Sequence, residues 1–123
     1  MAHRPRNLVA MAHVQDVRRS IAFYETLGFV VEATHSRPDA GSPVWAHLES
    51  GNAQLMLAIA SEPIDPANQD VLFYIYFDDI QATHAALAAK GLAVGELTYP
   101  FYCPKGEFRL MDPDGYCLML THV

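Results

Sequence analysis

Residues 112–120 read DPDGYCLML, a polar turn followed by a strand that is apolar on both faces. Proline and glycine beside aspartate are typical of a tight turn. Side chains alternate between the two faces of a strand, so Leu118 and Leu120 point one way while Cys117 and Met119 point the other. One leucine pair is enough to face a core. The second apolar face, centred on Met119, therefore needs an explanation of its own.

The Leu-Met-Leu triplet of this strand occurs twice in the chain. It stands at residues 55–57 and again, 63 positions later, at residues 118–120. With the same shift four further pairs coincide, namely Asp16 with Asp79, Ala22 with Ala85, Gly28 with Gly91 and Val31 with Val94. An internal repeat of this kind predicts two copies of one structural unit.

Each half of the chain contains the same order of structural signals. An aspartate begins each helical pattern as its N-cap, and a glycine ends it. Apolar residues at helical spacing lie between them. The first half predicts a strand at 7–14, a helix at 17–28 and strands at 29–35, 43–50 and 53–60. The second half predicts a strand at 71–77, a helix at 80–91 and strands at 92–98, 106–112 and 116–123.

The stretch 61–70, SEPIDPANQD, is rich in proline and poor in apolar residues, and we interpret it as the linker between the halves. A chain of 123 residues has the length of one domain. We therefore predict a single α+β domain built of two tandem βαβββ modules, at about 7–60 and 71–123. Their curved mixed sheets would carry the helices outside and enclose a concave cavity.

The composition excludes several classes of protein. A formal net charge of -6 and a pI near 5.3 argue against a nucleic-acid partner. No apolar run is long enough for a signal peptide or a membrane span, so we expect no membrane partner. The two cysteines, Cys103 and Cys117, form no CxxC pattern and do not indicate a disulfide scaffold. A cytoplasmic location is the expectation.

Two motifs carry a resemblance to a known family. Residues 16–29 follow the pattern D-x-x-x-S-I-x-F-Y-x-x-L-G-F, and residues 108–115 read F-R-L-x-D-P-D-G. Both resemble the vicinal oxygen chelate superfamily, which includes glyoxalase I, bleomycin-resistance proteins and extradiol dioxygenases. The resemblance spans essentially the whole chain and implies the fold predicted above, but the superfamily hosts many chemistries. Binding sites of the bleomycin-resistance branch form between two copies, which implies a homodimer here.

The resemblance also locates four positions at which enzymes of the superfamily hold a divalent metal. Their ligands are His, Glu or Gln on the first and last strands of each module. In this chain the corresponding residues are Val9 and Met56 in the first module, and Leu72 and Met119 in the second. Valine and leucine cannot ligate a metal, and thioethers bind hard divalent ions poorly. We therefore expect neither a metal nor another cofactor.

With Met119 facing inward, strand alternation assigns the other positions on the inner faces. In the first module they are Met11, His13, Val44, Ala46, Gln54 and Met56. In the second module they are Tyr74, Tyr76, Glu107, Arg109, Cys117 and Thr121. The same alternation places Trp45 and His47 on the helix side. An apolar surface with sparse polar groups is typical of a small-molecule pocket.

The loop at 98–106 contains several aromatic residues, among them Tyr102, and is predicted to form a rim or lid. The predicted ligand-binding residues are then Met11, His13, Gln54, Met56, Tyr74, Tyr76, Tyr102, Glu107, Arg109 and Met119. His13 and Glu107 are weak candidates for acid or base catalysis, and the sequence shows no partner carboxylate for His13. Glu107 and Arg109 could instead form a structural ion pair, or Arg109 could bind a carboxylate or phosphate.

Three functions are compatible with these residues. The favoured one is a metal-free protein that sequesters a hydrophobic or aromatic small molecule, similar to the bleomycin-resistance branch and its role in antibiotic resistance. The second is a glyoxalase- or dioxygenase-like enzyme, acting as lyase, isomerase or oxygenase with a metal or with an acid–base site. The third is an interaction module whose cavity is filled by Met56, Met119 and the tyrosines. All three stay open on the sequence alone.

Overall fold

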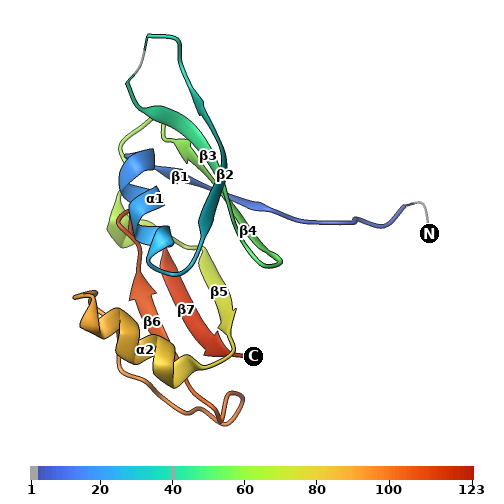
Figure 1. Cartoon of the computed structure of the whole chain (residues 1–123), viewed down its shortest axis with the longest axis vertical. Coiled ribbons are helices and arrows are strands. Elements are labelled where there is room, and N and C mark those ends of the chain that lie inside the picture. Colours follow the sequence, from blue (N-terminus) through green and yellow to red (C-terminus); the bar gives the residue numbers. More distant parts are fainter. Residues whose placement is uncertain (1–2, 40) are drawn as a thin grey trace. The chain divides into compact units, whose positions relative to one another are not determined.

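The structure is a computed structural model that describes residues 3–39 and 41–123. Residue 40, within a predicted loop, lies outside the described residues. The chain divides into two compact units, residues 1–63 and 64–123, and in the described residues each contains one sheet and one α-helix (Figure 1). The elements are β1 (Ala10–Val14), α1 (Val17–Glu25), β2 (Val30–Ser36), β3 (Pro43–Ser50), β4 (Ala53–Ile59), the 3-10 helix η1 (Pro66–Asn68), β5 (Leu72–Phe77), α2 (Ile80–Ala89), β6 (Glu107–Met111) and β7 (Cys117–His122).

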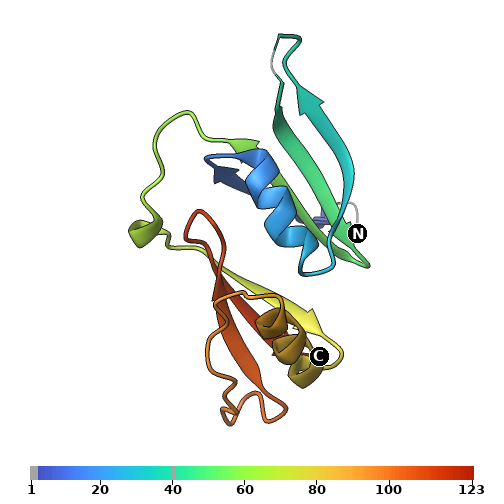
Figure 2. The same cartoon turned by 60° about the vertical axis from the view of Figure 1, so that its left-hand side comes forward.

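The first unit contains a four-stranded sheet in the order β1-β4-β3-β2. β1 runs parallel to β4, and the other neighbouring strands are antiparallel. Helix α1 packs against β3 and β4 on one face of this sheet (Figure 2). The buried residues of this layer are Ala12, Val14, Val17, Tyr24, Leu27, Phe29, Ala46, Leu48, Leu55 and Leu57.

The second unit contains a three-stranded sheet in the order β5-β7-β6. β5 is parallel to β7, and β6 is antiparallel to β7, as in the first unit with one strand fewer. Helix α2 contacts β7. The buried residues between helix and sheet are Ile80, Leu87, Phe108, Leu110, Leu118 and Leu120. We use the term open face for the side of each sheet that is turned away from its helix.

The strand predicted at 92–98 does not form, and this prediction was wrong. Thr98 makes an isolated bridge with Glu107, while the Gly95 amide donates to the Arg109 carbonyl at 2.8 Å. From Gly95 to Thr98 the chain advances one residue more than β6 does from Arg109 to Glu107, so a bulge interrupts the ladder. A Cβ at Gly95 would lie 3.0 Å from the Arg109 carbonyl oxygen, so this close approach needs glycine.

The helix ends confirm the capping residues that the sequence predicts. The Asp16 carboxylate accepts a hydrogen bond from the Arg19 amide, and Asp79 accepts one from the Ala82 amide at 3.0 Å. After α2, Gly91 has a φ of 86°, a conformation that glycine adopts without strain. Amides beyond the last turn bond back to carbonyls within it, as in a Schellman motif. Because these capping hydrogen bonds end the regular helix before the glycine, both helices are a few residues shorter than predicted.

Asp79→Ala is expected to lower the free energy of unfolding by about 1 kcal/mol, because the first turn of α2 loses its acceptor. Asp78→Ala is the matched control, since Asp78 is the exposed neighbour with the same charge. It should change stability by less than about 0.5 kcal/mol. Chemical denaturation followed by circular dichroism measures both. Equal losses in the two variants would assign the effect to charge rather than to capping.

Strand β3 has the opposite phase to the predicted one. Ala46 lies opposite Leu57 and is fully buried under α1, whereas His47 lies opposite Met56 on the open face. The predicted inward orientation of Val44 and Ala46, and the helix-side placement of Trp45 and His47, were therefore wrong. The physical reason is that the layer between α1 and the sheet accommodates apolar side chains. Leu48 is buried in this layer, and the polar His47 stays partly exposed on the other face.

Candidate functional site

The open face of the second sheet brings together most of the residues predicted there. Tyr74 and Arg109 both pair with Met119, and Glu107 and Tyr76 both pair with Thr121. Residues paired across a ladder point to the same side of a sheet, so these side chains share one face. The shared face agrees with the strand alternation read from the sequence. The role of each residue in ligand binding stays a prediction.

Part of this face is hollowed into a pocket of about 330 Å³, which we call the Glu107 pocket. Its lining consists of Gly95, Glu96, Thr98, Tyr102, Glu107, Phe108, Arg109 and Met119. Four of these are predicted ligand-binding residues. The bulged segment before β6 and the loop at 98–106 contribute to the lining, so part of the predicted rim does border a pocket. Gly95, Glu96 and Thr98 were missed because the sequence predicts an ordinary strand there.

Glu107 is the buried polar group of this pocket, with 4% of its surface exposed. The Tyr102 hydroxyl donates to Glu107 Oε2 at 3.0 Å. This hydrogen bond, with smaller contributions from desolvation and from the nearby carboxylate charge, raises the pKa of the Tyr102 phenol. Glu107 Oε1 is buried and has no hydrogen-bond partner among the described residues. Buried carboxylate oxygens are nearly always satisfied, so this arrangement is unusual.

Arg109 does not form the ion pair with Glu107 that the sequence suggested as one alternative. On the first sheet, the His47 ring lies 3.9 Å from the Glu49 carboxylate, a contact that becomes an ion pair when the histidine is protonated. The Arg109 side chain is exposed and lies at the border of the Glu107 pocket. Its guanidinium is therefore available to a ligand or to solvent.

Tyr74 and Tyr76 form an aromatic surface beside the pocket. Their ring centroids lie 6.3 Å apart with an interplanar angle of 29°, which is a stacked arrangement. The two side chains are 48% and 65% exposed. Aromatic rings offer a large apolar contact area together with a polar hydroxyl, and exposed apolar surface of this kind marks candidate binding sites.

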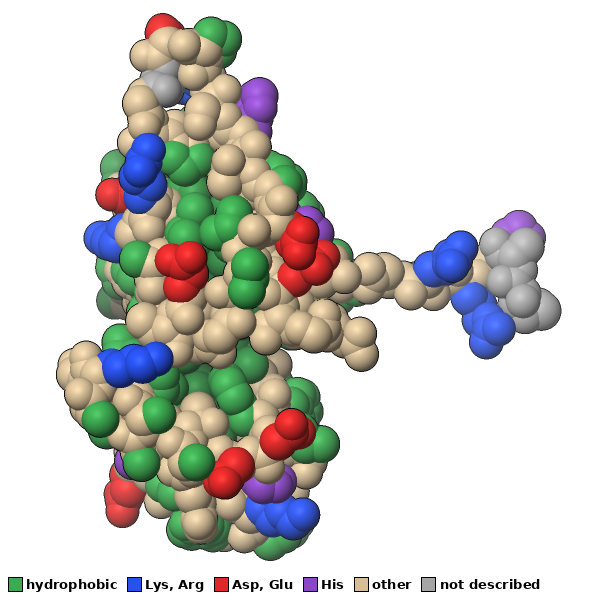
Figure 3. Space-filling view, viewed as in Figure 1, with side chains coloured by type: hydrophobic (Ala, Val, Ile, Leu, Met, Phe, Trp, Pro, Cys, Tyr) green, Lys and Arg blue, Asp and Glu red, His purple; other side chains and the backbone are tan. Residues whose placement is uncertain are grey.

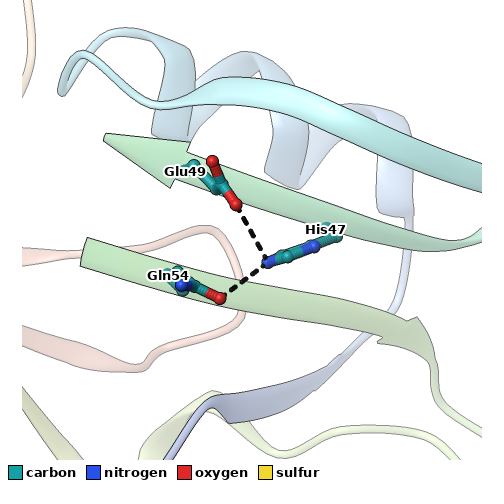
Figure 4. Close-up of polar contacts among 3 residues, drawn as sticks. All are labelled: His47, Glu49 and Gln54. Atoms are coloured by element: carbon teal, nitrogen blue, oxygen red, sulfur yellow. Dashed lines mark hydrogen bonds and ion pairs between the residues drawn. The ribbon is translucent and has the colours of Figure 1, made fainter. Parts of the chain in front are cut away.

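The open face of the first sheet carries a second group of predicted residues. Met11 and Met56 are paired across β1 and β4, and Gln54 lies on the same face. The His47 ring nitrogen Nε2 lies 3.1 Å from Gln54 Oε1 and 3.9 Å from Glu49 Oε1 (Figure 4). Sequence reasoning missed His47 and Glu49 on this face, because it assigned β3 the wrong phase. The burial of Leu48 is the signal that fixes that phase.

His13 is exposed on β1 and points to the same open face. Its partner across the ladder is Ala58 rather than a carboxylate. The role of His13 as a catalytic base stays a prediction.

The model of the Glyoxalase/Bleomycin resistance protein/Dioxygenase superfamily matches residues 8–120. The chain belongs to this superfamily. The match covers β1 through most of β7 and includes both the helix motif and the turn at 112–115. The resemblance stated from the sequence is thereby confirmed.

Solved structures of the superfamily share the whole fold. The bleomycin resistance determinant encoded on the transposon Tn5 is 19% identical, with 96% of this chain and 98% of that chain covered and a TM-score of 0.77. TnmS3, an antibiotic binding protein from Streptomyces sp. CB03234, is 22% identical, with coverages of 98% and 97% and a TM-score of 0.73. The bleomycin-binding protein from Streptomyces verticillus, solved with copper(II)-bleomycin, is 21% identical, covers 98% of each chain and has a TM-score of 0.70.

At these identities the likeness establishes the fold alone. No curated protein matches the chain. No α-helix in the described residues is long and apolar enough to cross a membrane.

The four positions that hold metal in superfamily enzymes do not fit a divalent ion here. Leu72 pairs with Cys117, two residues before Met119 on β7, so Leu72 and Met119 share the open face of the second sheet. Met56 lies on the open face of the first sheet, and Val9 directly precedes β1. None of these side chains offers an oxygen or imidazole donor. The described residues also contain no group of three or more His, Cys, Asp or Glu that could hold a metal.

Cys103 anchors the loop that borders the Glu107 pocket. Its thiol is buried, 2.9 Å from the Thr121 hydroxyl and 3.2 Å from the Gly106 carbonyl oxygen. Thr121 belongs to β7, so this contact ties the loop to the middle strand of the sheet. The sequence gives no sign of this contact, because the two residues are 18 positions apart and share no local pattern.

Proposed function

We propose that the chain binds an apolar or aromatic small molecule, without a metal, at the open face of its second sheet. The Glu107 pocket carries the proposal. Met119 lies at this pocket where superfamily enzymes place a metal ligand, Tyr102 borders it, and the Tyr74–Tyr76 stack continues the surface. The pocket itself combines apolar surface from Tyr102, Phe108 and Met119 with charged groups. Apolar contacts together with polar groups that orient the ligand are the usual make-up of a small-molecule site.

The superfamily supports this proposal. Structural relatives include a bleomycin-binding protein and an antibiotic binding protein. Sequestration requires affinity and exclusion of water rather than a reacting group, so methionine and leucine at the metal positions are compatible with it. The proposed ligand class is a planar aromatic or a glycopeptide-like compound, as for an antibiotic-resistance protein.

A thermal-shift screen against planar aromatic and glycopeptide-like compounds tests the proposal. At least one compound is expected to raise the melting temperature, because a ligand that binds only the folded state stabilises it. Tyr74→Ala should then weaken binding of that compound by about tenfold, the effect of losing an aromatic contact and its buried area. Isothermal titration calorimetry measures the change in affinity.

Tyr99→Ala is the matched control for Tyr74→Ala. Tyr99 is 53% exposed, close to the value for Tyr74, but its hydroxyl accepts a hydrogen bond from Gln81 at the start of α2. Tyr74, in contrast, lies beside Met119 of the Glu107 pocket on the open face of the sheet. Substitution of Tyr99 should leave affinity unchanged. Absence of any stabilising compound, or equal losses in both tyrosine variants, would contradict the proposed site.

The proposal includes a homodimer and a cytoplasmic location. The open face of the second sheet exposes Leu72 and Tyr76, and Met111 is exposed at the end of β6, apolar surface that a second copy could cover. Light scattering of the purified protein is expected to give twice the mass of one chain.

Both cysteines are free thiols, which agrees with a reducing compartment. The proposal includes no nucleic-acid partner, because the formal net charge is -6. On the face drawn in Figure 3, basic side chains lie at separate places.

A further inference from the structure

Glu107 uses only one of its two carboxylate oxygens within the described residues. Oε2 accepts the hydrogen bond of the Tyr102 hydroxyl, and Oε1 is buried without a partner there. Burying a carboxylate costs several kcal/mol unless hydrogen bonds replace its hydration. A group in this state at the border of a pocket is a candidate acceptor for a ligand.

The side chains around Glu107 do not supply the second donor. Arg109 lies on the same face but makes no ion pair with Glu107. The Thr121 hydroxyl, on the strand opposite, lies 2.9 Å from the Cys103 thiol. The Thr98 hydroxyl donates to the backbone carbonyl of Glu107 rather than to its carboxylate. None of these three side chains donates to Oε1, which has no hydrogen-bond partner among the described residues.

The charges at the Glu107 pocket favour a cation. Two carboxylates, Glu96 and Glu107, border it together with a single guanidinium, that of Arg109. Glu96 and Arg109 are more open to solvent and screened by it, whereas Glu107 is buried. A charge-assisted hydrogen bond to Glu107 would therefore be the strongest polar contact that a ligand could make here.

We propose that Glu107 binds a positively charged hydrogen-bond donor, a protonated amine or amidinium, carried by an aromatic ligand. This inference rests on the proposed function and specifies its ligand class. Tyr102 acts as the gate of this subsite. Its side chain is 61% exposed and is held at the carboxylate by its one hydrogen bond to Oε2. Its rotation outward uncovers the carboxylate, so that the donor can reach the buried Oε1 and also share Oε2.

Two planar probes of nearly the same shape test the proposal. At pH 7.5, 9-aminoacridine is a cation, and acridine is neutral. Fluorescence titration of the full chain is expected to show at least about tenfold tighter binding of 9-aminoacridine, the value of one charge-assisted hydrogen bond. Glu107→Gln keeps the shape of the side chain and should remove this preference, while the affinity for acridine stays within about twofold.

Glu96→Gln is the matched control, because it removes the other carboxylate of the same pocket. It should change the affinity for 9-aminoacridine by less than about twofold, since Glu96 is screened by solvent. Equal effects of the two substitutions would overturn the proposal in favour of a general attraction by the acidic chain. A melting curve shows whether each variant is folded.

Tyr102→Phe provides a second variant that leaves the carboxylate in place. It is expected to tighten 9-aminoacridine binding by at least about threefold, because the phenol no longer competes for Oε2. Weaker binding would overturn the gate.

Failure of this inference is distinguishable from failure of the proposed function. Equal affinities for acridine and 9-aminoacridine would overturn the cation subsite and leave aromatic binding standing. No binding of either probe, together with no stabilising compound in the screen, would overturn both.

Discussion

Gly115→Ala is expected to destabilise the second unit by about 3 kcal/mol or more. Gly115 has a φ of 85°, which costs an alanine about 1–2 kcal/mol. A Cβ at this position would also lie 2.3 Å from the Pro66 carbonyl oxygen and 2.6 Å from the Pro66 Cα. These are backbone atoms, which cannot rotate away as the end of a side chain can, so η1 or the turn at 112–115 must move.

Gly91→Ala separates the two contributions. Gly91 has nearly the same φ, 86°, but a Cβ added there would have no atom within 4 Å apart from those of its chain neighbours. Gly91→Ala should lower the free energy of unfolding only by the conformational cost of about 1–2 kcal/mol. Urea denaturation of both variants measures the difference, which reports the contact with Pro66. Equal losses would show that η1 yields to the new methyl group at no cost.

Phe108→Ala is expected to lower the free energy of unfolding by about 3–5 kcal/mol, the usual effect of emptying a buried phenylalanine site. Phe108 is 1% exposed, and its ring meets the His84 ring of α2 edge-on at a centroid distance of 4.7 Å. The substitution removes a contact that joins α2 to β6. Chemical denaturation again provides the measurement.

Phe101→Ala is the control of identical chemistry. Phe101 is 95% exposed in the loop before β6, so its loss should stay within about 0.5 kcal/mol. A large loss in Phe101→Ala would mean that its ring is covered in solution, for example by a second copy of the chain. A small loss in Phe108→Ala would mean that the layer between α2 and the sheet collapses around the missing ring.

Features that depend on local chemistry could be predicted from the sequence. Asp79 and Gly91 mark the ends of α2 because capping needs a short acceptor and a residue that tolerates positive φ. Strand β7 could be predicted with its two faces, since Leu118 and Leu120 alternate with Met119 without interruption. The open face of the second sheet followed from that alternation.

Features that depend on contacts distant in sequence could not be predicted in this way. The phase of β3 is set by which side α1 covers, and residues 44–48 are apolar or aromatic at nearly every position. The bulge at Gly95 arises from its close approach to Arg109. Tertiary contacts likewise bury Glu107 and bring the Tyr102 hydroxyl to its Oε2. The aromatic composition of the loop could not predict either feature.

The strand order has a consequence for the kinetics of folding. In both units the strand that comes last in sequence, β4 or β7, lies between the first strand and its other neighbour. The first strand of each unit therefore has no sheet partner until the last one inserts, and the pairing of Tyr74 with Met119 closes a long loop. Such non-local pairing slows folding, because loop entropy is lost before contacts form. During synthesis, β5 with its exposed tyrosines stays unpaired until β7 has emerged, and chaperone dependence should concentrate in that interval.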